Sequence, residues 1–473
     1  MSEPPKIGSD EWVARSHERV EGGAGARGAL IRIGARVGWW WRLAGCVVVA
    51  ALIPHVTSSG YVVTVGINTL LLALLALGLN VVVGWAGLLD LGYVAFYGFG
   101  AYLYALICSD QLGGGVHVAS EFAIPLVMIA AGILGFVIGS TSRRVSGDYL
   151  AIVTLFFGEI FTEVVGVDVP GVTGGPNGVT GVDPIHAFGA QITSINGYYY
   201  FALVVTVIVM AALHLLDSSR TGRAWRAVRE EPLAAELMSI SVNRLKILAF
   251  VVGAVIAALA GTIFAAFETG TYPTDFDTSF LVLVYAAVIL GGAGSIAGVV
   301  VGAVVVSVML EILRNPTEAG YIFYGLILVT LVGRLRPWRT LAAVLAALVV
   351  FGVAVHAIAA AISSAAVAGG PQSQGWIGVA LRYWVVVPVN ATNLGNWGYG
   401  LLLLAVVGLT RVGRTVRLVL LVPTIYLASF VWETVLVTNP TTTREILVGV
   451  ILIVLMIARP NGALGVRRVE VAT

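Results

Sequence analysis

Long apolar runs separated by short polar segments fill most of the chain from residue 43 onward. Many of these runs approach the ~20 residues that an α-helix needs to cross a bilayer. Fourteen segments fit the pattern, and several are shorter than a full span. They lie at 43–57, 61–83, 90–108, 122–140, 149–167, 198–216, 247–267, 281–293, 296–313, 319–333, 340–362, 397–410, 418–437 and 445–458. The pattern predicts an all-α, polytopic membrane bundle of about 10–14 transmembrane helices.

The positions of the basic residues give an orientation to these segments. If the N-terminus is cytoplasmic and every segment crosses, 24 of the 27 Lys and Arg residues face the cell interior. Only Arg314, Arg382 and Arg444 remain outside. This asymmetry is what the positive-inside rule expects. The charges therefore predict a multi-pass protein of the inner (plasma) membrane, with both termini in the cytoplasm.

Composition supports a membrane protein and gives little support to other classes. Hydrophobic residues make up 58% of the 473 residues and charged residues 11%, whereas soluble domains are about a quarter charged. A net charge of +2 gives no reason to expect nucleic-acid binding. Cys46 and Cys108 both lie in apolar runs, which favours packing over a disulfide framework. The first 38 residues are polar and predict a cytoplasmic tail without a cleaved signal peptide.

The motifs that usually carry enzyme chemistry do not occur in this sequence. The two lysines, Lys6 and Lys246, do not follow a glycine, so the sequence contains no phosphate-binding P-loop. The six histidines show no metal-binding helical spacing, and no Gly-x-Ser-x-Gly motif occurs. The sequence therefore predicts neither an enzyme nor a resident metal or cofactor.

One densely charged segment interrupts the apolar pattern, between residues 217 and 246. Gly222–Phe250 reads GRAWRAVREEPLAAELMSISVNRLKILAF and holds four Arg, three Glu and one Lys. Such charges need an aqueous environment. Pro232 suits the first turn of a new short helix, on which Leu233 and Leu237 share one face. Ser241 could cap the following helix. This pattern favours a docking surface for a soluble partner; a solvated loop with ordinary surface charges is the alternative.

A second unusual segment, residues 168–197, lacks Lys and Arg and contains the turn-rich sequence GVTGGPNGVTGV at 171–182. The predicted orientation places it outside. Its central residues are Gly174, Gly175, Pro176 and Asn177. They indicate either a structural loop or a contact with a partner that delivers solute.

Several motifs together resemble one family. Glu231–Glu236, EPLAAE, is similar to the EAA-type coupling motif of ABC importer permeases. Other segments resemble the LivM-type permeases of branched-chain amino-acid transporters, in the same order along the chain. These segments are ALGLN at 76–80, GWAGLLDLGY at 84–93, GDYLAIVTL at 147–155 with Glu159, TGGPNG at 173–178, LGGAGS at 290–295 and RPNGALG at 459–465. The resemblance covers about residues 60–313 and the last twenty or so.

The resemblance implies an importer built from several subunits. Its partners would be a second homologous permease subunit, two cytoplasmic ATP-binding subunits and an extracytoplasmic solute-binding protein. Hydrolysis of ATP would take place on the separate ATPases. The residues implied to couple this chain to those ATPases are Arg226, Arg229, Glu230, Glu231, Leu233, Ala234, Ala235, Glu236 and Ser239.

Transport also implies a polar path near the middle of the bilayer, built from broken helices. The candidates are Asn80, Asp90, Thr154, Glu159 and Glu163, with Gly84, Gly87 and Gly92 permitting a break. Each polar side chain could instead make an interhelical hydrogen bond or lie at a helix end. The glycines at 290–295 are compatible with either a tight inside turn or a re-entrant break.

Two departures from the family pattern stand out. Ser239 occupies a position where the coupling motif usually has glycine, and about 110 residues between 320 and 440 have no counterpart in the family. We therefore expect a tail at 1–38, a permease core at 39–315 and additional membrane helices and loops at 316–443. A terminal helix with a cytoplasmic tail would follow at 444–473.

Two other function classes remain at this point. An ion-gradient-driven secondary transporter of a small polar solute could use Asp90, Glu159 and Glu163 as coupling carboxylates, but would leave the charged segment unexplained. A scaffolding membrane subunit would leave the glycine breaks and the polar positions without a role. The solute itself, a branched-chain or related amino acid or a small amide, is not fixed by the sequence.

Overall fold

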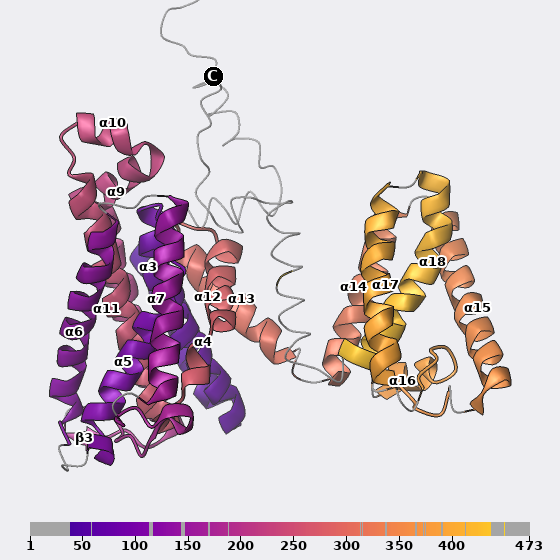
Figure 1. The fold of residues 1–473 in the computed structure, drawn as a ribbon, viewed down its shortest axis with the longest axis horizontal. Helices are drawn as coiled ribbons and strands as arrows, with labels where there is room; N and C mark the ends of the chain where they lie inside the picture. Colours follow the sequence, from indigo (N-terminus) through magenta and orange to yellow (C-terminus); the bar gives the residue numbers. More distant parts are fainter. Residues whose placement is uncertain are drawn as a thin grey trace, which may run out of the picture.

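The computed structural model describes residues 38–436, apart from 58, 113–116, 143–146, 169–170, 188, 313, 315, 336–337, 365–366, 372, 374, 389–390 and 412, and also residue 449. In this part of the chain nine helices are long and apolar enough to cross a membrane, and shorter apolar helices accompany them. Figure 1 shows the helices of the first group running roughly parallel between two ends of the molecule. The fold is all-helical apart from four two-residue strands in the described residues.

A first group of helices runs from α3 to α13. Its elements are α3 (Trp39–Val56), α4 (Gly60–Leu79), η1 (Asn80–Trp85), α5 (Tyr93–Ile107), η2 (Asp110–Leu112), α6 (Ser120–Thr141), α7 (Asp148–Val167), η3 (Gly175–Asn177), α8 (Ile195–Ser218), α9 (Arg220–Glu230), α10 (Pro232–Leu237), α11 (Val242–Glu268), η4 (Pro273–Phe276), α12 (Thr278–Gly291) and α13 (Ile296–Ile312).

The core of the first group is formed around α4 and α11. Both helices are apolar on nearly all sides, which is typical of a helix surrounded by other helices. α11 packs against α5, α6 and α4, and α4 also packs against α8 and α13. Between α5 and α11 a Cβ at Gly100 would lie 2.4 Å from the Cα of Ala258. Only glycine permits this approach of the two backbones.

The end of the bundle that carries the loop at 168–194 is closed by two short antiparallel pairs. β1 (Val179–Thr180) pairs with β4 (Gly270–Thr271), and β2 (His186–Ala187) pairs with β3 (Ala190–Gln191). The charged segment, with α9 and α10, lies at the opposite end (Figure 1). The two unusual segments of the sequence therefore lie on opposite sides of the predicted membrane layer.

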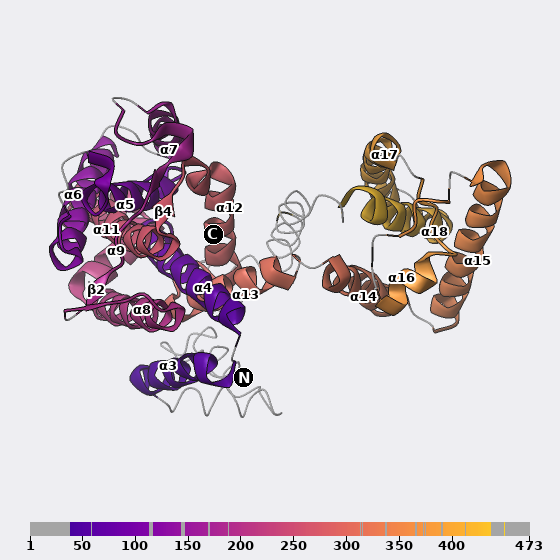
Figure 2. The same ribbon diagram turned by 90° about the horizontal axis from the view of Figure 1, so that it is seen from below.

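A second group of helices follows the first. It consists of α14 (Pro316–Arg334), α15 (Trp338–Ile362), α16 (Gly375–Leu381), α17 (Ala391–Arg411), α18 (Arg414–Val431) and η6 (Trp432–Leu436). Figure 2 shows this group beside the first one, joined to it through α13 and α14. Glu433, fully buried, accepts hydrogen bonds from the Tyr324 hydroxyl (3.2 Å) and from the Ser373 backbone N–H (3.0 Å). Glu433 therefore holds together α14, η6 and the segment around Ser373.

Each predicted apolar segment from 43–57 to 418–437 overlaps a helix, and the segment at 445–458 lies outside the described residues except for residue 449. The glycines at 290–295 form the tight turn between α12 and α13, with Gly292 at φ 106° and Gly294 at φ 96°. Whether this turn lies at the inside surface or re-enters the membrane stays a prediction. The predicted limits of the domains stay a prediction.

Candidate functional site

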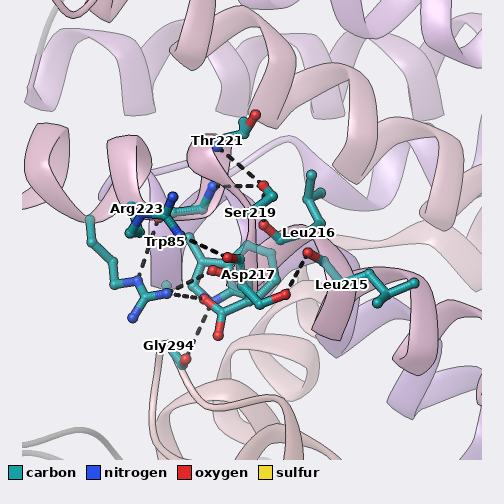
Figure 3. Close-up of polar contacts among 12 residues, drawn as sticks. Trp85, Leu215, Leu216, Asp217, Ser219, Thr221, Arg223 and Gly294 are labelled. Atoms are coloured by element: carbon teal, nitrogen blue, oxygen red, sulfur yellow. Dashed lines mark hydrogen bonds and ion pairs between the residues drawn. The ribbon is translucent and has the colours of Figure 1, made fainter.

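The charged segment forms two short helices, α9 and α10. The Ser219 hydroxyl caps α9 by accepting hydrogen bonds from the backbone N–H groups of Thr221 (3.1 Å) and Gly222 (3.4 Å), as Figure 3 shows. On the solvent side, Arg226 pairs with Asp217 at 3.0 Å. On the opposite side, Trp225 and Val228 are buried. α9 is therefore amphipathic and lies along the end of the bundle.

α10 begins and ends as a short independent helix. Pro232 occupies its first turn, as predicted, and Glu231 is its N-cap residue. At its C-terminal end the backbone N–H of Ile240 donates to the Ala235 carbonyl (3.1 Å), and that of Ser239 donates to the Glu236 carbonyl (3.0 Å). This pair of bonds is a Schellman motif, and Ser239 takes the left-handed conformation the motif requires, at φ 62°.

Large apolar side chains of α10 point away from the protein. The exposed fractions are 71% for Leu233, 86% for Leu237 and 78% for Met238. Ala235, in contrast, is 4% exposed and packs in a small cluster with Val228 and Val242. Its methyl group attaches α10 to α9 and α11, so Ala235 does not project with the exposed tip; its part in coupling stays a prediction.

The remaining residues of the predicted coupling set, apart from the half-buried Arg229, are on the surface. Glu230, Glu231, Ala234, Glu236 and Ser239 are all exposed, and Arg226 is exposed on α9. Ser241 stands at the N-cap position of α11, as predicted, but its side chain makes no capping hydrogen bond. The charged rim and the apolar tip of α10 together form one surface at the end of the bundle.

Directly below α9, α4 ends in a break. After α4 the chain continues as a wider π-turn, η1. Residues 86–90 are not helical, and residues 91–92 form a turn that leads into α5. Gly87 has φ 70°, which only glycine adopts readily, and a Cβ at Gly92 would lie 2.0 Å from the Thr154 carbonyl oxygen. The structure thus has a break at these glycines, and their place on a transport path stays a prediction.

The π-turn is bound to the α12–α13 turn through Gly294. The Asn80 side-chain carbonyl accepts the Gly294 N–H at 2.7 Å. The Trp85 indole N–H donates to the Gly294 carbonyl at 3.2 Å, as Figure 3 shows. A Cβ at Gly84 would lie 2.6 Å from the Gly294 nitrogen. Asn80 and Gly84 are thus structural partners of a distant turn, at the same end of the bundle as the charged segment.

The other end of the break is attached to α7 and α12. The Thr154 hydroxyl accepts the Leu91 N–H (2.9 Å), and the Tyr285 hydroxyl donates to the Asp90 carbonyl (2.7 Å). The Asp90 carboxylate is fully buried; one oxygen accepts the Gly92 N–H at 3.0 Å, and the other has no hydrogen-bond partner among the described residues. A half-satisfied buried carboxylate is unusual and keeps Asp90 as a candidate for the transport path.

Glu159 and Glu163 are exposed on α7 and do not join Asp90. The Thr278 hydroxyl donates a hydrogen bond to the Glu159 carboxylate, which links α7 to α12. The space between Leu91, Glu159 and Thr278 measures about 10 Å³, room for little more than one water molecule. The candidate residues of the path therefore form separate contacts, and this space is too small for an amino acid.

At the opposite end, the predicted outside loop is tightly hydrogen-bonded. An Asp168 carboxylate oxygen accepts the N–H groups of Thr173 (2.8 Å) and Gly174 (2.9 Å). The residues at 175–177 form the turn η3, which leads into β1. A Cβ at Gly174 would lie 2.1 Å from the Gly178 carbonyl oxygen. The glycines of this loop serve its geometry.

Sequence reasoning did not find several residues of this site. Trp85, Trp225, Tyr285 and Thr278 make contacts between elements that lie far apart in the chain. Only Trp225 had a signal in the sequence. It is a large apolar side chain among four arginines, which is typical of the buried side of an amphipathic helix.

Comparison with known proteins agrees with this geometry. The profile of the family described as "Branched-chain amino acid transport system / permease component" matches residues 61–332. The chain belongs to this permease family. It is accordingly a multi-pass membrane subunit of an ABC importer, without a catalytic role of its own. The matched region ends within α14, so most of the second group of helices lies beyond it.

Individual relatives place this permease near the LivM type. It is 34% identical over 306 residues to the high-affinity branched-chain amino acid transport system permease protein LivM of Salmonella typhimurium, covering 60% of this chain and 70% of the relative. It is 28% identical over 258 residues to LivH of the same species, covering 50% and 79%. It is also 27% identical over 151 residues to the fructose import permease protein FrcC of Rhizobium meliloti, covering 30% and 42%. No solved structure matches.

Proposed function

We propose that this permease carries a branched-chain or closely related amino acid into the cell, driven by two separate ATPase subunits. Its identity to LivM supports this solute class. The similarity to a fructose permease means that membership of the wider group does not by itself select the solute. In this proposal the charged segment and both termini face the cytoplasm, in line with the positive charges.

The surface of α10 carries the proposal. Leu233, Leu237 and Met238 project from a segment that must be in water because of its charges. Exposed clusters of large apolar side chains with a charged rim are typical of protein interfaces. Because Ala235 packs against Val228 and Val242, α10 can be displaced together with α9. A soluble ATPase seated on this tip would thus push on both helices.

A second permease subunit completes the path in this proposal. Glu159 lies exposed among large apolar side chains of α7, including Phe156 (62% exposed) and Ile160 (59%). A carboxylate is costly in contact with lipid tails, so a protein surface is expected to cover this side of α7. The space beside Glu159 and Thr278 would then widen into a solute path between two subunits. A solute-binding protein would deliver to the opposite end, near Gly174–Asn177.

Reconstitution into proteoliposomes tests this function. The permease is combined with its partner permease, the ATPases and the solute-binding protein, and uptake of labelled leucine is measured with and without ATP. Uptake that requires both ATP and the ATPases supports the proposal. Uptake driven by an ion gradient without the ATPases would establish a secondary transporter instead. Competition by unlabelled isoleucine, valine and fructose then defines the solute class.

A further inference from the structure

The buried side of α9 connects the charged segment to the break in α4. The Trp225 side chain is fully buried, and its indole N–H donates to the Leu245 carbonyl at 2.8 Å. Its rings stack on those of Trp85, with centroids 6.0 Å apart and an angle of 30° between the planes. Trp225 therefore contacts both the start of α11 and the π-turn η1.

One turn further along α9, Arg229 makes a second contact with the same break. Its guanidinium donates a hydrogen bond to the Gly84 carbonyl, in the last residues of η1. The Arg229 side chain also lies against Gly87 and Gly294. A Cβ added at Gly87 would lie 3.0 Å from a side-chain carbon of Arg229, and one added at Gly294 would lie 3.1 Å from a guanidinium nitrogen of Arg229. Arg229 is thus enclosed by three glycines from two separate segments.

The contact is favourable for a simple physical reason. The last carbonyl groups of a helix have no partner within the helix, and a cation there also interacts well with the helix dipole. Hydrogen bonds from a charged donor are about twice as strong as neutral ones. The three glycines leave the space that the guanidinium occupies, and a larger residue at Gly87 or Gly294 would crowd it.

Movement of the break would reach the candidate transport path. Gly84 belongs to η1, whose Asn80 and Trp85 hold Gly294 in the α12–α13 turn. On the far side of the break, Asp90 and Leu91 are bonded to Tyr285 of α12 and Thr154 of α7. A continuous series of contacts therefore runs from the charged segment to the two helices that carry Glu159 and Thr278.

We propose that Arg229, together with Trp225, is the positioning pair that transmits movement of the ATPase-bound segment to the 80–92 break and, through it, to α7 and α12. The inference rests on the proposed function, because it requires an ATPase that acts on α9 and α10. It adds the residues through which that action enters the membrane helices. Neither residue touches solute; both act through the backbone of the break.

The test separates coupling from folding and from docking. Arg229→Gln removes the charged donor, and Arg229→Lys restores a cation that can reach one carbonyl. Arg223→Gln is the matched control, because Arg223 lies on the same helix, is exposed and donates to the nearby Ser218 carbonyl (2.9 Å) rather than to the break. Each variant is reconstituted with the ATPases, and ATP hydrolysis, leucine uptake and co-purification of the ATPases are measured on the same preparation.

A second readout follows the break itself and needs no solute. Leu89 is 46% exposed in the break, so a cysteine placed there in a Cys46→Ser background reports its accessibility to a maleimide. In the wild-type background we expect the labelling rate to change when ATP and vanadate are added. In Arg229→Gln this change should be lost while the ATPases still co-purify. The number of leucine molecules transported per ATP hydrolysed should fall about tenfold in Arg229→Gln. Loss of one charge-assisted hydrogen bond corresponds to a change of about this size.

Partial recovery of both readouts in Arg229→Lys, with wild-type behaviour of Arg223→Gln, supports the inference. Wild-type uptake and labelling in Arg229→Gln would overturn it and leave the proposed function intact. Absence of any ATP effect in the wild type would overturn both. If Arg229→Gln does not assemble, Trp85→Leu takes its place, since it removes the ring that stacks on Trp225 and leaves Arg229 in place. An unchanged ratio in Trp85→Leu would then contradict the inference.

Discussion

The Nδ1 atom of His117 lies 2.5 Å from Oδ2 of Asp183, and this contact joins the segment before α6 to the loop after β1. The other ring nitrogen of His117 lies 3.0 Å from Oδ1 of Asp110. The imidazole thus bridges two carboxylates that come from different segments. Both belong to the end of the bundle opposite the charged segment, and His186 lines the same small cavity.

This bridge predicts a pH-dependent stability of the outside loop. The hydrogen bond to Asp183, followed by that to Asp110, raises the pKa of His117 above its usual value near 6.5. Because the folded pKa is raised, the stabilisation is fully present below pH ~6.5 and is lost as the pH rises through the folded pKa. We expect hydrogen exchange of the peptides around 117–120 and 182–186 to be slowest in mildly acidic buffer and to accelerate above pH ~6.5.

The control for this prediction removes the titrating group. His117→Gln keeps a hydrogen-bonding side chain without a charge, so its exchange should lack the extra acceleration once the intrinsic pH dependence of exchange is subtracted. The same corrected profile in wild type and His117→Gln would show that the bridge does not govern the loop.

Ser239 predicts a stabilising substitution. The residue is held at φ 62° by the hydrogen bonds that end α10, and a non-glycine residue in this region costs about 1–2 kcal/mol. Ser239→Gly should therefore stabilise the end of α10 by roughly 1 kcal/mol, after the larger entropy loss of glycine is included. Hydrogen exchange of the peptide spanning 232–241 should slow several-fold.

Ser241→Gly is the matched control for this substitution. Ser241 has φ −77° and makes no capping bond with its side chain, so glycine there relieves no strain and adds flexibility to the unfolded chain. Exchange in the same peptide should not slow. Equal effects of the two substitutions would contradict the assignment of strain to Ser239.

Features of the fold that depend on neighbouring residues in the chain could be predicted from the sequence. The positions of the membrane helices follow from long apolar runs, and Pro232 marks the start of α10, because these signals are local. The strain at Ser239 had a local signal as well, namely serine at a position where related motifs have glycine. Whether that serine is accommodated depends on backbone angles that the sequence does not specify.

The contacts of the candidate site depend on long-range packing. Asn80, a candidate for the transport path, bonds the Gly294 backbone, and no periodicity links two residues so far apart. Ala235 reads as a small surface residue beside two leucines, but packing against Val228 and Val242 buries it. The second group of helices has alternating apolar segments that predict spans, yet its buried Glu433 and Ser373 meet only through tertiary folding.

Gly100 predicts how sensitive the core of the first group is to added volume. A Cβ there would lie 2.4 Å from both the Cα and the carbonyl oxygen of Ala258, which are backbone atoms of α11 that no rotamer change can move. Gly100→Ala should therefore separate α5 from α11 and destabilise the protein by about 1–3 kcal/mol. Thermal unfolding in detergent should show a lower midpoint.

Gly132 on α6 provides the comparison, since α6 packs on the same helix α11. A Cβ at Gly132 would meet a methyl group of Val255 at 3.4 Å, an ordinary contact. Gly132→Ala should leave the midpoint unchanged or raise it slightly, because alanine favours the helix by up to ~1 kcal/mol. If both substitutions lower the unfolding midpoint equally, the close approach of α5 and α11 is not the cause of the destabilisation.

Leu237 tests the docking surface directly. Its side chain is 86% exposed at the tip of α10, so Leu237→Ala removes apolar area from the surface without creating a cavity in the permease. If Leu237 is an anchor of the ATPase interface, the variant should bind the ATPases about tenfold more weakly, since truncation of an anchor residue costs 1–2 kcal/mol or more. Arg223→Ala is the control, because Arg223 is exposed on α9 outside the predicted coupling set, and an exposed charge contributes little to affinity. Binding measured by titration of detergent-solubilised permease with ATPase should separate the two. If Leu237→Ala and the wild type bind the ATPases with equal affinity, Leu237 is not an anchor, and the ATPase interface does not include the tip of α10.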